Sequence, residues 1–233
     1  MNTPGRLLIT AGPTHEPIDA VRFIGNRSSG RMGLAIAGAA AALGWDVTLL
    51  LGPSCVASAP LCIHTHRFRT CADLQQLLRD HTPDADVLVM AAAVADYRPV
   101  PNPALASGKF RRTEGPVTLS LESTPDLLAE VARTRRPDQL MVGFALEPEP
   151  DLLASAKSKL SRKKIDMVVA NPLETMDSDS VRAVVLFADG ARQDTPGTID
   201  KPHFAQWLMK LIAQSWRERS GHSAVELNDV ITV

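Results

Sequence analysis

The chain has 233 residues, of which 45% are apolar, and its charged residues nearly balance, giving a formal net charge of −1. This length and composition suit one α/β domain with a sizeable core, and the balanced charge gives no reason to expect nucleic acid or a membrane surface as a partner. No apolar run approaches the ~20 residues that a membrane-spanning helix needs. The cysteines Cys55, Cys62 and Cys71 form no CxxC pair, so a cytoplasmic setting with structural thiols is expected.

Short apolar segments alternate along the chain with longer segments of helical pattern. The segments that predict strands are 6–10, 46–51, 61–66, 87–93, 117–122, 140–145, 167–170 and 181–187. The segments that predict helices are 30–43, 72–80, 125–134, 151–163 and 202–215. This alternation predicts an α/β, Rossmann-like three-layer fold, in which helices cover both faces of a mostly parallel central sheet.

We expect one domain over residues 1–216, followed by a C-terminal tail, 217–233, that has no clear pattern. Open sheets of this kind bind ligands beyond the carboxyl ends of their strands, at the point where the strand order reverses. The loops in which to look for a site are therefore those after Thr10, Met90 and Ala145.

The connection after the first strand is unusually long. It runs from Ala11 to Gly33 without the G-x-G-x-x-G turn of dinucleotide-binding folds, and loops of this length inside a domain are usually functional. Ser28, Ser29 and Gly30 fall where the next helix begins. Backbone N–H groups, the positive helix end and the serine hydroxyls would form an anion site there. The simpler interpretation is that one serine only caps the helix.

This loop, AGPTHEPIDAVRFIGNRSSGRMG, resembles at nearly every position the synthetase domain of the bifunctional coenzyme A biosynthesis flavoproteins, the phosphopantothenoylcysteine synthetases. The resemblance implies that Gly12, Arg22 and Asn26 bind substrate and that Asn26 also processes an acyl-nucleotide intermediate. A neutral amide suits that role, because it hydrogen-bonds a developing charge without adding a competing nucleophile. Without the resemblance, Asn26 would be interpreted as a residue that stabilises a turn.

The run AAAVADYRP, residues 91–99, is similar to a second motif of the same family. Small side chains there let a base or ribose approach the backbone closely, and the resemblance implies that Asp96 accepts hydrogen bonds from ribose hydroxyls. On its own, an alanine run usually indicates only close packing.

The run GKFRR, residues 108–112, resembles a mobile family loop that closes over the nucleotide phosphates. Lys109 would then stabilise the triphosphate and the leaving pyrophosphate. Arg111 and Arg112 stand where the family has lysines, and arginine prefers planar, bidentate contacts, so their role does not carry over. Without the resemblance, this segment would be a solvated basic loop.

Three later motifs complete the pattern: TPDL at the start of a helix, VGFALE around a strand, and two lysines four residues apart on one helix face. The family usually has threonine where this chain has Pro148, so the local turn departs from the pattern. The nucleotide-binding set that the resemblance implies is Ser28, Ser29, Gly30, Ala92, Ala93, Asp96, Lys109, Thr124, Pro125, Asp126, Leu127, Phe144, Lys159 and Lys163.

Candidate metal ligands are few. His64 and His66 alternate on a predicted strand and share one face, but no third ligand accompanies them. Glu16 and Asp19 would organise the substrate loop or a metal, and the sequence does not choose between these roles.

The resemblance implies a standalone phosphopantothenate–cysteine ligase, because no flavin-binding decarboxylase domain precedes the matched region. Such an enzyme converts 4′-phosphopantothenate and CTP into an acyl-cytidylate, with Mg²⁺ accompanying the triphosphate and no flavin. L-Cysteine then forms the amide, and a separate decarboxylase is a further expected partner. The family also implies a homodimer joined by a projecting strand pair, to which the alternating residues 117–122 are suited.

Two alternatives stay open, and a third is disfavoured. An ATP-using synthetase and a noncatalytic nucleotide-binding relative are both compatible with the motifs. A short-chain oxidoreductase is disfavoured because the glycine fingerprint is absent and no Tyr-x-x-x-Lys pair exists. The single tyrosine, Tyr97, is followed four residues later by Pro101.

Overall fold

The computed structural model describes residues 5–54, 60–101, 108–109, 115–176 and 178–221 of the chain. Eight strands form the central sheet, in the order β13-β12-β10-β9-β6-β1-β4-β5. The parallel strands are β1 (Arg6–Ala11), β4 (Asp46–Leu51), β5 (His64–Arg67), β6 (Val87–Met90), β9 (Leu140–Glu147) and β10 (Met167–Pro172). The strands β12 (Val184–Phe187) and β13 (Arg192–Asp194) continue the sheet in antiparallel pairing.

The strand order reverses between β1 and β6. From β1 the chain passes to β4 on one side, and from β6 it passes to β9 on the other, although β1 and β6 are themselves neighbours with Thr10 opposite Met90. This is the switch point of a doubly wound sheet. The predicted Rossmann-like α/β class is therefore confirmed.

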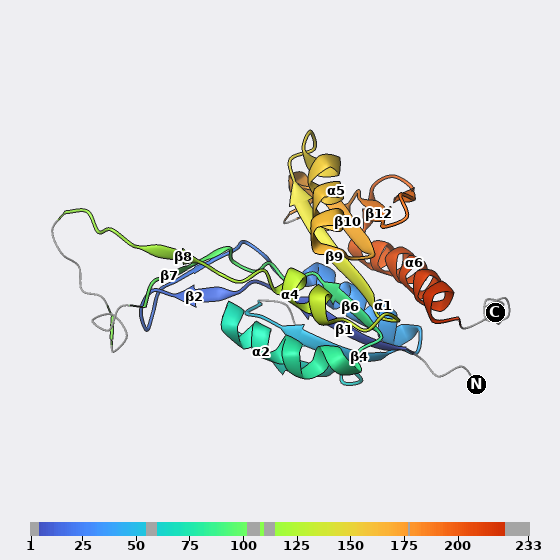
Figure 1. Cartoon of the computed structure of the whole chain (residues 1–233). Helices are drawn as coiled ribbons and strands as arrows, with labels where there is room; N and C mark the ends of the chain where they lie inside the picture. The colour runs from blue at the N-terminus through green and yellow to red at the C-terminus, as the bar shows by residue number, and fades with distance from the viewer. Residues whose placement is uncertain (1–4, 55–59, 102–107, 110–114, 177, 222–233) are drawn as a thin grey trace.

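Helices cover both faces of the sheet (Figure 1). One face carries α1 (Arg31–Ala42) and α6 (Lys201–Ser220), and the other carries α2 (Cys71–His81), α4 (Leu127–Thr134) and α5 (Leu152–Lys163). Successive side chains of a strand point to opposite faces. In β1, Ile9 accordingly belongs to the core cluster that contains Phe204 of α6, whereas Leu8 belongs to the cluster that contains Leu74 of α2. Two apolar layers, one on each side of the sheet, form the core.

Two short strand pairs extend away from the carboxyl edge of the sheet, to the left in Figure 1. The hairpin of β2 (His15–Pro17) and β3 (Phe23–Gly25) lies beside the ribbon of β7 (Tyr97–Pro99) and β8 (Leu121–Ser123). We refer to these four strands and the described residues that join them as the arm. The ring of His15 stacks on that of Phe23, with centroids 3.7 Å apart. The long loop after β1 is thus a hairpin that builds half of the arm.

Several predicted strands have different bounds in the structure. The predicted strand 61–66 begins only at His64, because the N–H of Ile63 closes a turn onto the carbonyl of Pro60. The predicted strand 87–93 ends at Met90, because the N–H of Ala92 bonds to the Thr10 side chain and that of Ala93 to the Gly12 carbonyl in the loop after β1. The predicted strand 117–122 is shifted, since only 121–123 pairs with β7.

The predicted strand 181–187 is two strands. Its start belongs to β11 (Ser180–Val181), which pairs with β14 (Ile199–Asp200), and its end is β12 in the central sheet. The N–H of Ala183 bonds to the hydroxyl of Thr195 at 3.2 Å, at the point where the chain changes sheets. The remaining regular elements within the described residues are the 3-10 turns η1 (Thr82–Asp84) and η2 (Leu173–Thr175).

Two helix ends also differ from prediction. Helix α4 begins at Leu127 and not at Pro125, because the carboxylate of Asp126 caps it by accepting the N–H of Ala129 at 3.1 Å. Helix α6 continues to Ser220, past the predicted helix end at residue 215. The rest of the expected tail, 222–233, lies outside the described residues, as does Cys55.

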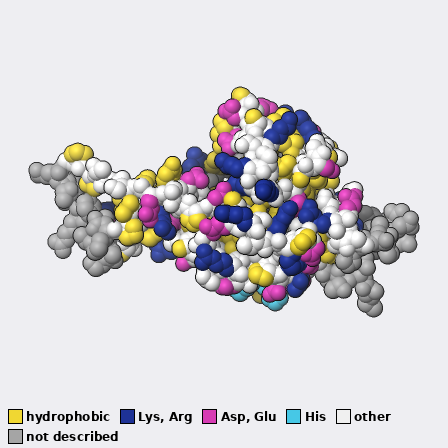
Figure 2. Space-filling model, viewed as in Figure 1, with side chains coloured by type: hydrophobic (Ala, Val, Ile, Leu, Met, Phe, Trp, Pro, Cys, Tyr) yellow, Lys and Arg dark blue, Asp and Glu magenta, His cyan; other side chains and the backbone are white. Residues whose placement is uncertain are grey.

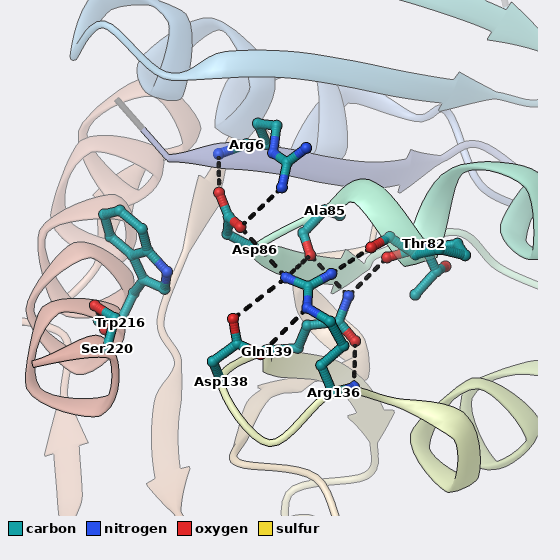
Figure 3. A network of polar contacts seen from close by, with 10 residues as sticks. Arg6, Thr82, Ala85, Asp86, Arg136, Asp138, Gln139, Trp216 and Ser220 are labelled. Atoms are coloured by element: carbon teal, nitrogen blue, oxygen red, sulfur yellow. Dashed lines mark hydrogen bonds and ion pairs between the residues drawn. The ribbon is translucent and has the colours of Figure 1, made fainter. Parts of the chain in front are cut away.

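The amino edge of the sheet is held by a polar network (Figure 3). Arg136 donates to the carbonyls of Pro83 and Ala85 and pairs with Asp86, and Gln139 donates to the Ala85 carbonyl at 2.7 Å. Asp86 also accepts the backbone N–H of Arg6 at 2.8 Å. The starts of β1, β6 and β9 are therefore fixed to one another at the edge opposite the arm.

Candidate functional site

A cavity of about 670 Å³ opens at the carboxyl edge of the sheet, over the switch point. Its walls come from the loops after β1, β6 and β9 and from helices α4 and α5. This volume falls within the usual range for small-molecule and cofactor sites. The three loops singled out from the sequence therefore meet at one cavity.

The first wall is the turn before α1. Gly30 is the residue before the first turn of α1 and has φ of 75°, a left-handed conformation that glycine adopts without strain. A Cβ there would lie 3.3 Å from the backbone nitrogen of Gly12. Ser54 fixes the turn by donating its hydroxyl to the carbonyl of Ser29 at 2.6 Å. Ser28, Ser29 and the first residues of α1 line the cavity, and a helix start of this kind can accept an anion.

The second wall is the alanine-rich loop after β6, which lies against the end of β1 and the loop after it. The N–H of Ala92 donates to the hydroxyl of Thr10 at 3.0 Å, and the N–H of Ala93 donates to the carbonyl of Gly12 at 3.0 Å. The side-chain amide of Asn26 donates to the carbonyl of Val94 at 3.0 Å. These bonds leave the small side chains of this loop and Asp96 at the cavity surface.

The third wall carries two lysines of α5. The ammonium of Lys159 donates to the carbonyl of Phe144, and that of Lys163 lies 2.8 Å from the carboxylate of Asp126. Burial, and then the positive charge of Lys163, lower the pKa of Lys159 to about 8. Partial burial acts to raise the pKa of Asp126, but hydrogen bonds from Lys163 and the Ala129 N–H outweigh it and hold that pKa below its ordinary value.

Most of the residues assigned to nucleotide binding line this cavity. They are Ser28, Ser29, Gly30, Ala92, Ala93, Asp96, Thr124, Pro125, Asp126, Leu127, Phe144, Lys159 and Lys163. Asn26 reaches the rim through its bond to Val94, which lines the cavity, and Gly12 lies beneath the turn at Gly30. The sequence therefore identified a set of residues that the fold brings together.

Two expected site residues lie on the arm instead. Arg22 pairs with Asp19 at 2.9 Å in the turn of the β2–β3 hairpin. Lys109 is exposed, and the carbonyl of the preceding Gly108 accepts the N–H of Ala20 at 3.4 Å in that same turn. Neither side chain is among the described residues that line the cavity of its own chain. The neighbouring residues 110–112 lie outside the described residues.

Sequence reasoning missed several basic residues of the cavity, namely Arg27, Arg31, Arg162 and Lys201. Arg31 pairs with Asp179 at 2.8 Å and so joins the start of α1 to the loop after β10. Two of them could have been found from the sequence. Arg31 directly follows the Ser-Ser-Gly turn, and Arg162 is three residues from Lys159 on the same helix. Lys201 is brought in by the fold from the far end of the chain.

Glu16 and Asp19 organise the hairpin loop. The buried carboxylate of Glu16 accepts the N–H of Cys71, the first residue of α2, at 2.8 Å. Asp19 accepts the N–H groups of Val21 and Arg22 at 2.8 and 2.7 Å. Burial raises the pKa of the Cys71 thiol to about 11, which agrees with a structural role. In the described part of the chain, no group of three His, Cys, Asp or Glu residues is placed to hold a metal ion.

Among the described residues, no helix is both long enough and apolar enough to cross a membrane.

Comparison with known proteins identifies the family. Residues 3–215 match the family described as the DNA/pantothenate metabolism flavoprotein C-terminal domain. The chain is 43% identical over 197 residues to the coenzyme A biosynthesis bifunctional protein CoaBC of Mycobacterium bovis, covering 79% of this chain and 46% of that protein. It is also 43% identical over 169 residues to a protein named cysteine/cysteine sulfinic acid decarboxylase from an unknown prokaryotic organism, covering 72% of this chain and 46% of that protein.

The chain thus spans about half the length of these curated relatives. Among solved structures, the C-terminal domain of the bifunctional protein CoaBC matches it with a TM-score of 0.77 and 33% identity, covering 94% of this chain and 100% of that one. Family, fold and cavity agree with the motifs read from the sequence. The chain belongs to the DNA/pantothenate metabolism flavoprotein C-terminal domain family, as its resemblance to phosphopantothenoylcysteine synthetase domains predicts.

Proposed function

We propose that the chain is a phosphopantothenate–cysteine ligase of coenzyme A biosynthesis that uses CTP. The observation that carries the proposal is the cavity at the switch point. The turn before α1 and the small side chains of the loop after β6 line it, together with Phe144 and two lysines of α5. Such a cavity is suited to a nucleoside triphosphate, with phosphates at the start of α1 and the base between α4 and Phe144. Family membership supplies the rest of the support, since the CoaBC relatives are named for coenzyme A biosynthesis.

The proposed reaction has two steps. A carboxylate oxygen of 4′-phosphopantothenate attacks the α-phosphorus of CTP, the bond from that phosphorus to the bridging oxygen breaks, and pyrophosphate leaves. The amine nitrogen of L-cysteine then attacks the acyl carbon, the carbon–oxygen bond to the nucleotide breaks, and CMP leaves with the electron pair while the amine loses a proton. Neither step forms a bond to the protein, so positioning and charge stabilisation carry the catalysis.

The positions of several side chains support the proposed roles. Ser28, Ser29 and the first N–H groups of α1 would bind phosphate oxygens, and Asp96 would accept hydrogen bonds from the ribose. Asn26, fixed to the carbonyl of Val94, would bind the oxygen on which charge develops in each step. Phe144 would pack on the base.

Mg²⁺ is expected to arrive with the triphosphate. Such ions are usually held by phosphate oxygens, water and one or two carboxylates. The cavity fits that pattern, since Asp96 and Glu147 line it and would help to hold the ion, while no described cluster of three ligand residues forms a cage. When bound, the ion would neutralise part of the phosphate charge.

We further propose that the active form is a homodimer joined through the arm. Exposed apolar side chains gather along the arm, as the left part of Figure 2 shows. They are Val21, Phe23, Tyr97, Val100, Val117, Leu119 and Leu121. Contiguous exposed apolar surface of this kind usually marks an interface. Because Lys109 is attached to the arm and not to its own cavity, the dimer would place it at the partner's cavity. A separate decarboxylase remains the proposed user of the product.

A noncatalytic nucleotide-binding protein is the second candidate. It is favoured by the position of Lys109 on the arm and by the engagement of Lys159 and Lys163 with protein partners. Under this alternative the cavity would bind a nucleotide without turning it over.

The test is pyrophosphate release from the full chain with 4′-phosphopantothenate and Mg²⁺, using CTP or ATP, with and without L-cysteine. Release with CTP together with a cysteine-dependent amide product is the expected result. The same result with ATP alone would replace CTP by ATP in the proposal. Nucleotide binding without release, by folded protein, would overturn the ligase and support the noncatalytic candidate.

A further inference from the structure

Helix α5 borders a second concave region. Ser155, Lys159 and Lys163 line the nucleotide cavity, whereas Lys157 and Lys164, with their neighbours Leu160 and Ser161, line a groove of about 500 Å³. Because residues three or four apart share a helix face, these two sets lie on opposite sides of α5. We call this region the α5 groove. It lies between α5, or the residues that follow it, and the turn from β12 to β13.

The floor of the α5 groove is apolar. Ile165 and Leu186 form its buried part, with 2% and 5% of their surface exposed, and Leu160, which packs in the same core cluster, is partly exposed beside them. Ala191, in the exposed turn between β12 and β13, completes one side. A floor of this kind binds the hydrocarbon part of a ligand through burial of apolar surface.

The border of the α5 groove is positively charged. The exposed Lys157 and Lys164 lie on it together with Arg135. Its carboxylate, Asp166, is shared, since it pairs with Arg135 at 2.5 Å and also with the guanidinium of Arg219. Figure 2 shows Lys and Arg side chains gathered around the surface that α5 occupies in Figure 1. Positive charge therefore exceeds negative charge at the edge of an apolar floor.

Lys164 has an unusual backbone for a lysine. It ends α5 with φ of 52° and ψ of 45° and is the sole non-glycine residue with positive φ in the described part of the chain. Glycine is the usual residue at such a helix end, and a side chain there costs about 1–2 kcal/mol. A lysine at this position is unfavourable for the fold itself, and Lys164 is one of the residues that line the groove.

We propose that the α5 groove binds an anion that carries an aliphatic chain, of the class of medium-chain carboxylates. The chain would lie on Leu160, Ile165 and Leu186, and the carboxylate would be bound by Lys157 and Lys164. Charge complementarity selects this class, because a neutral chain would leave the ammonium groups without a counter-charge and a small anion would make no contact with the apolar floor.

The direct test is calorimetric titration of the full chain, without nucleotide, using octanoate as the probe. 1-Octanol tests the need for charge, and butyrate tests the need for chain length. Octanoate is expected to bind with a single site per chain, and both control ligands are expected to bind about tenfold more weakly or not at all. Equal binding of octanol would overturn the anion requirement, and absence of octanoate binding would overturn the site.

Two variants locate the site. Lys164→Gly removes the ammonium and suits the left-handed backbone, so it is expected to fold at least as stably as the parent chain. Ala191→Glu places a carboxylate in the exposed turn, where it repels the ligand. Each should weaken octanoate binding about tenfold, whereas Lys210→Gln, an exposed charge removal on α6, should leave it unchanged. Unchanged binding in both groove variants would overturn the assignment.

The α5 groove would also communicate with the nucleotide cavity, because α5 carries residues of both. This part rests on the proposed function. Saturating octanoate is expected to change the dissociation constant of CTP, and CTP is expected to change that of octanoate by the same factor. Octanoate binding without this reciprocal change removes the communication and keeps the site. Failure of CTP binding under all conditions would contradict the proposed function and leave the octanoate result standing.

Discussion

Asn26 is the residue whose replacement tests the proposed chemistry most directly. Its amide joins the loop after β1 to the loop after β6 through the Val94 carbonyl. Asn26→Ala is expected to slow amide formation by about 10²- to 10³-fold, because it removes the group proposed to stabilise developing charge. Mass spectrometry of the product measures the rate of amide formation, and calorimetry separately measures the affinity for CTP.

The control for this variant is Gln214→Ala, which truncates an exposed amide on α6. It is expected to change neither rate nor binding. A rate for Asn26→Ala close to that of the parent chain would remove Asn26 from catalysis and leave it as a turn residue.

Lys159 predicts opposite pH effects on binding and on stability. With its pKa lowered to about 8, its ammonium loses the proton well below the ordinary value of 10.5. As pH rises through about 8, the attraction for a triphosphate is lost, so the dissociation constant of CTP should rise. Lys159→Arg keeps the charge and should flatten this rise. A rise of equal size in both proteins would exclude Lys159 as its cause.

The stability effect has the other sign. Between about pH 8 and 10.5 the folded Lys159 has lost its proton while the unfolded one retains it, so the unfolded state binds more protons. The contribution of this group to the free energy of unfolding therefore increases with pH across that window. Urea unfolding of the unliganded protein and of Lys159→Gln, compared at several pH values, measures the difference.

At the scale of elements, the start of α1 depends on Gly30. Gly30→Ala is expected to cost about 1–2 kcal/mol, because alanine is strained at positive φ and its Cβ would lie 3.3 Å from the Gly12 nitrogen. CTP affinity should fall as well, since the turn proposed to bind the phosphates must shift. Thermal unfolding and calorimetry give the two values.

Helix α1 supplies its own matched control at Gly38, where an added Cβ would meet no atom within 4 Å. Gly38→Ala is expected to stabilise the protein by up to about 1 kcal/mol through helix propensity, with unchanged CTP affinity. Equal effects of the two substitutions would contradict a special backbone at Gly30.

Most elements of the sheet could be predicted from the sequence because their burial is regular. β4 and the helix positions follow from continuous apolar runs and from helical spacing, which depend on local pattern alone. The division of 181–187 into β11 and β12 could not, because Val181 and Val184 are both apolar and only tertiary contacts such as Ala183 with Thr195 separate them. The loss of strand after Met90 has the same origin, since the N–H of Ala92 bonds to the Thr10 side chain and that of Ala93 bonds to the Gly12 carbonyl.

The candidate site was predictable where motifs are contiguous. The turn at Ser28–Gly30 and the loop to Asp96 are runs along the chain, so their residues could be named before the fold was known. Lys201 could not be found from the sequence. It is the first residue of α6, and it lines the cavity because the fold places the start of that helix there. The position of Lys109 on the arm likewise depends on the bond between Gly108 and Ala20.

At the scale of the whole molecule, the dimer proposal makes a prediction about mixtures. Lys109→Ala and Asn26→Ala chains are each expected to be nearly inactive. If Lys109 serves the partner's cavity, a mixed dimer carries one cavity with both changes and one with neither. Co-refolding equal amounts should therefore restore about a quarter of the parent activity.

If Lys109 instead serves its own cavity, every cavity in the mixture carries one change and activity stays low. Light scattering of each variant shows whether dimers form. A monomeric and fully active parent chain would overturn the dimer itself.

The carboxyl edge of the sheet also determines when, during synthesis, the cavity is complete. The bonds that close the cavity join distant parts of the chain, with Asn26 and Val94 separated by 68 residues and Thr14 and Ala95 by 81. The ribosome releases β1, α1 and β4 early, yet the third wall, with Lys159, follows only after β9. Long-range contacts of this kind form late. A nascent chain would therefore hold half of its sheet well before any nucleotide could stabilise it.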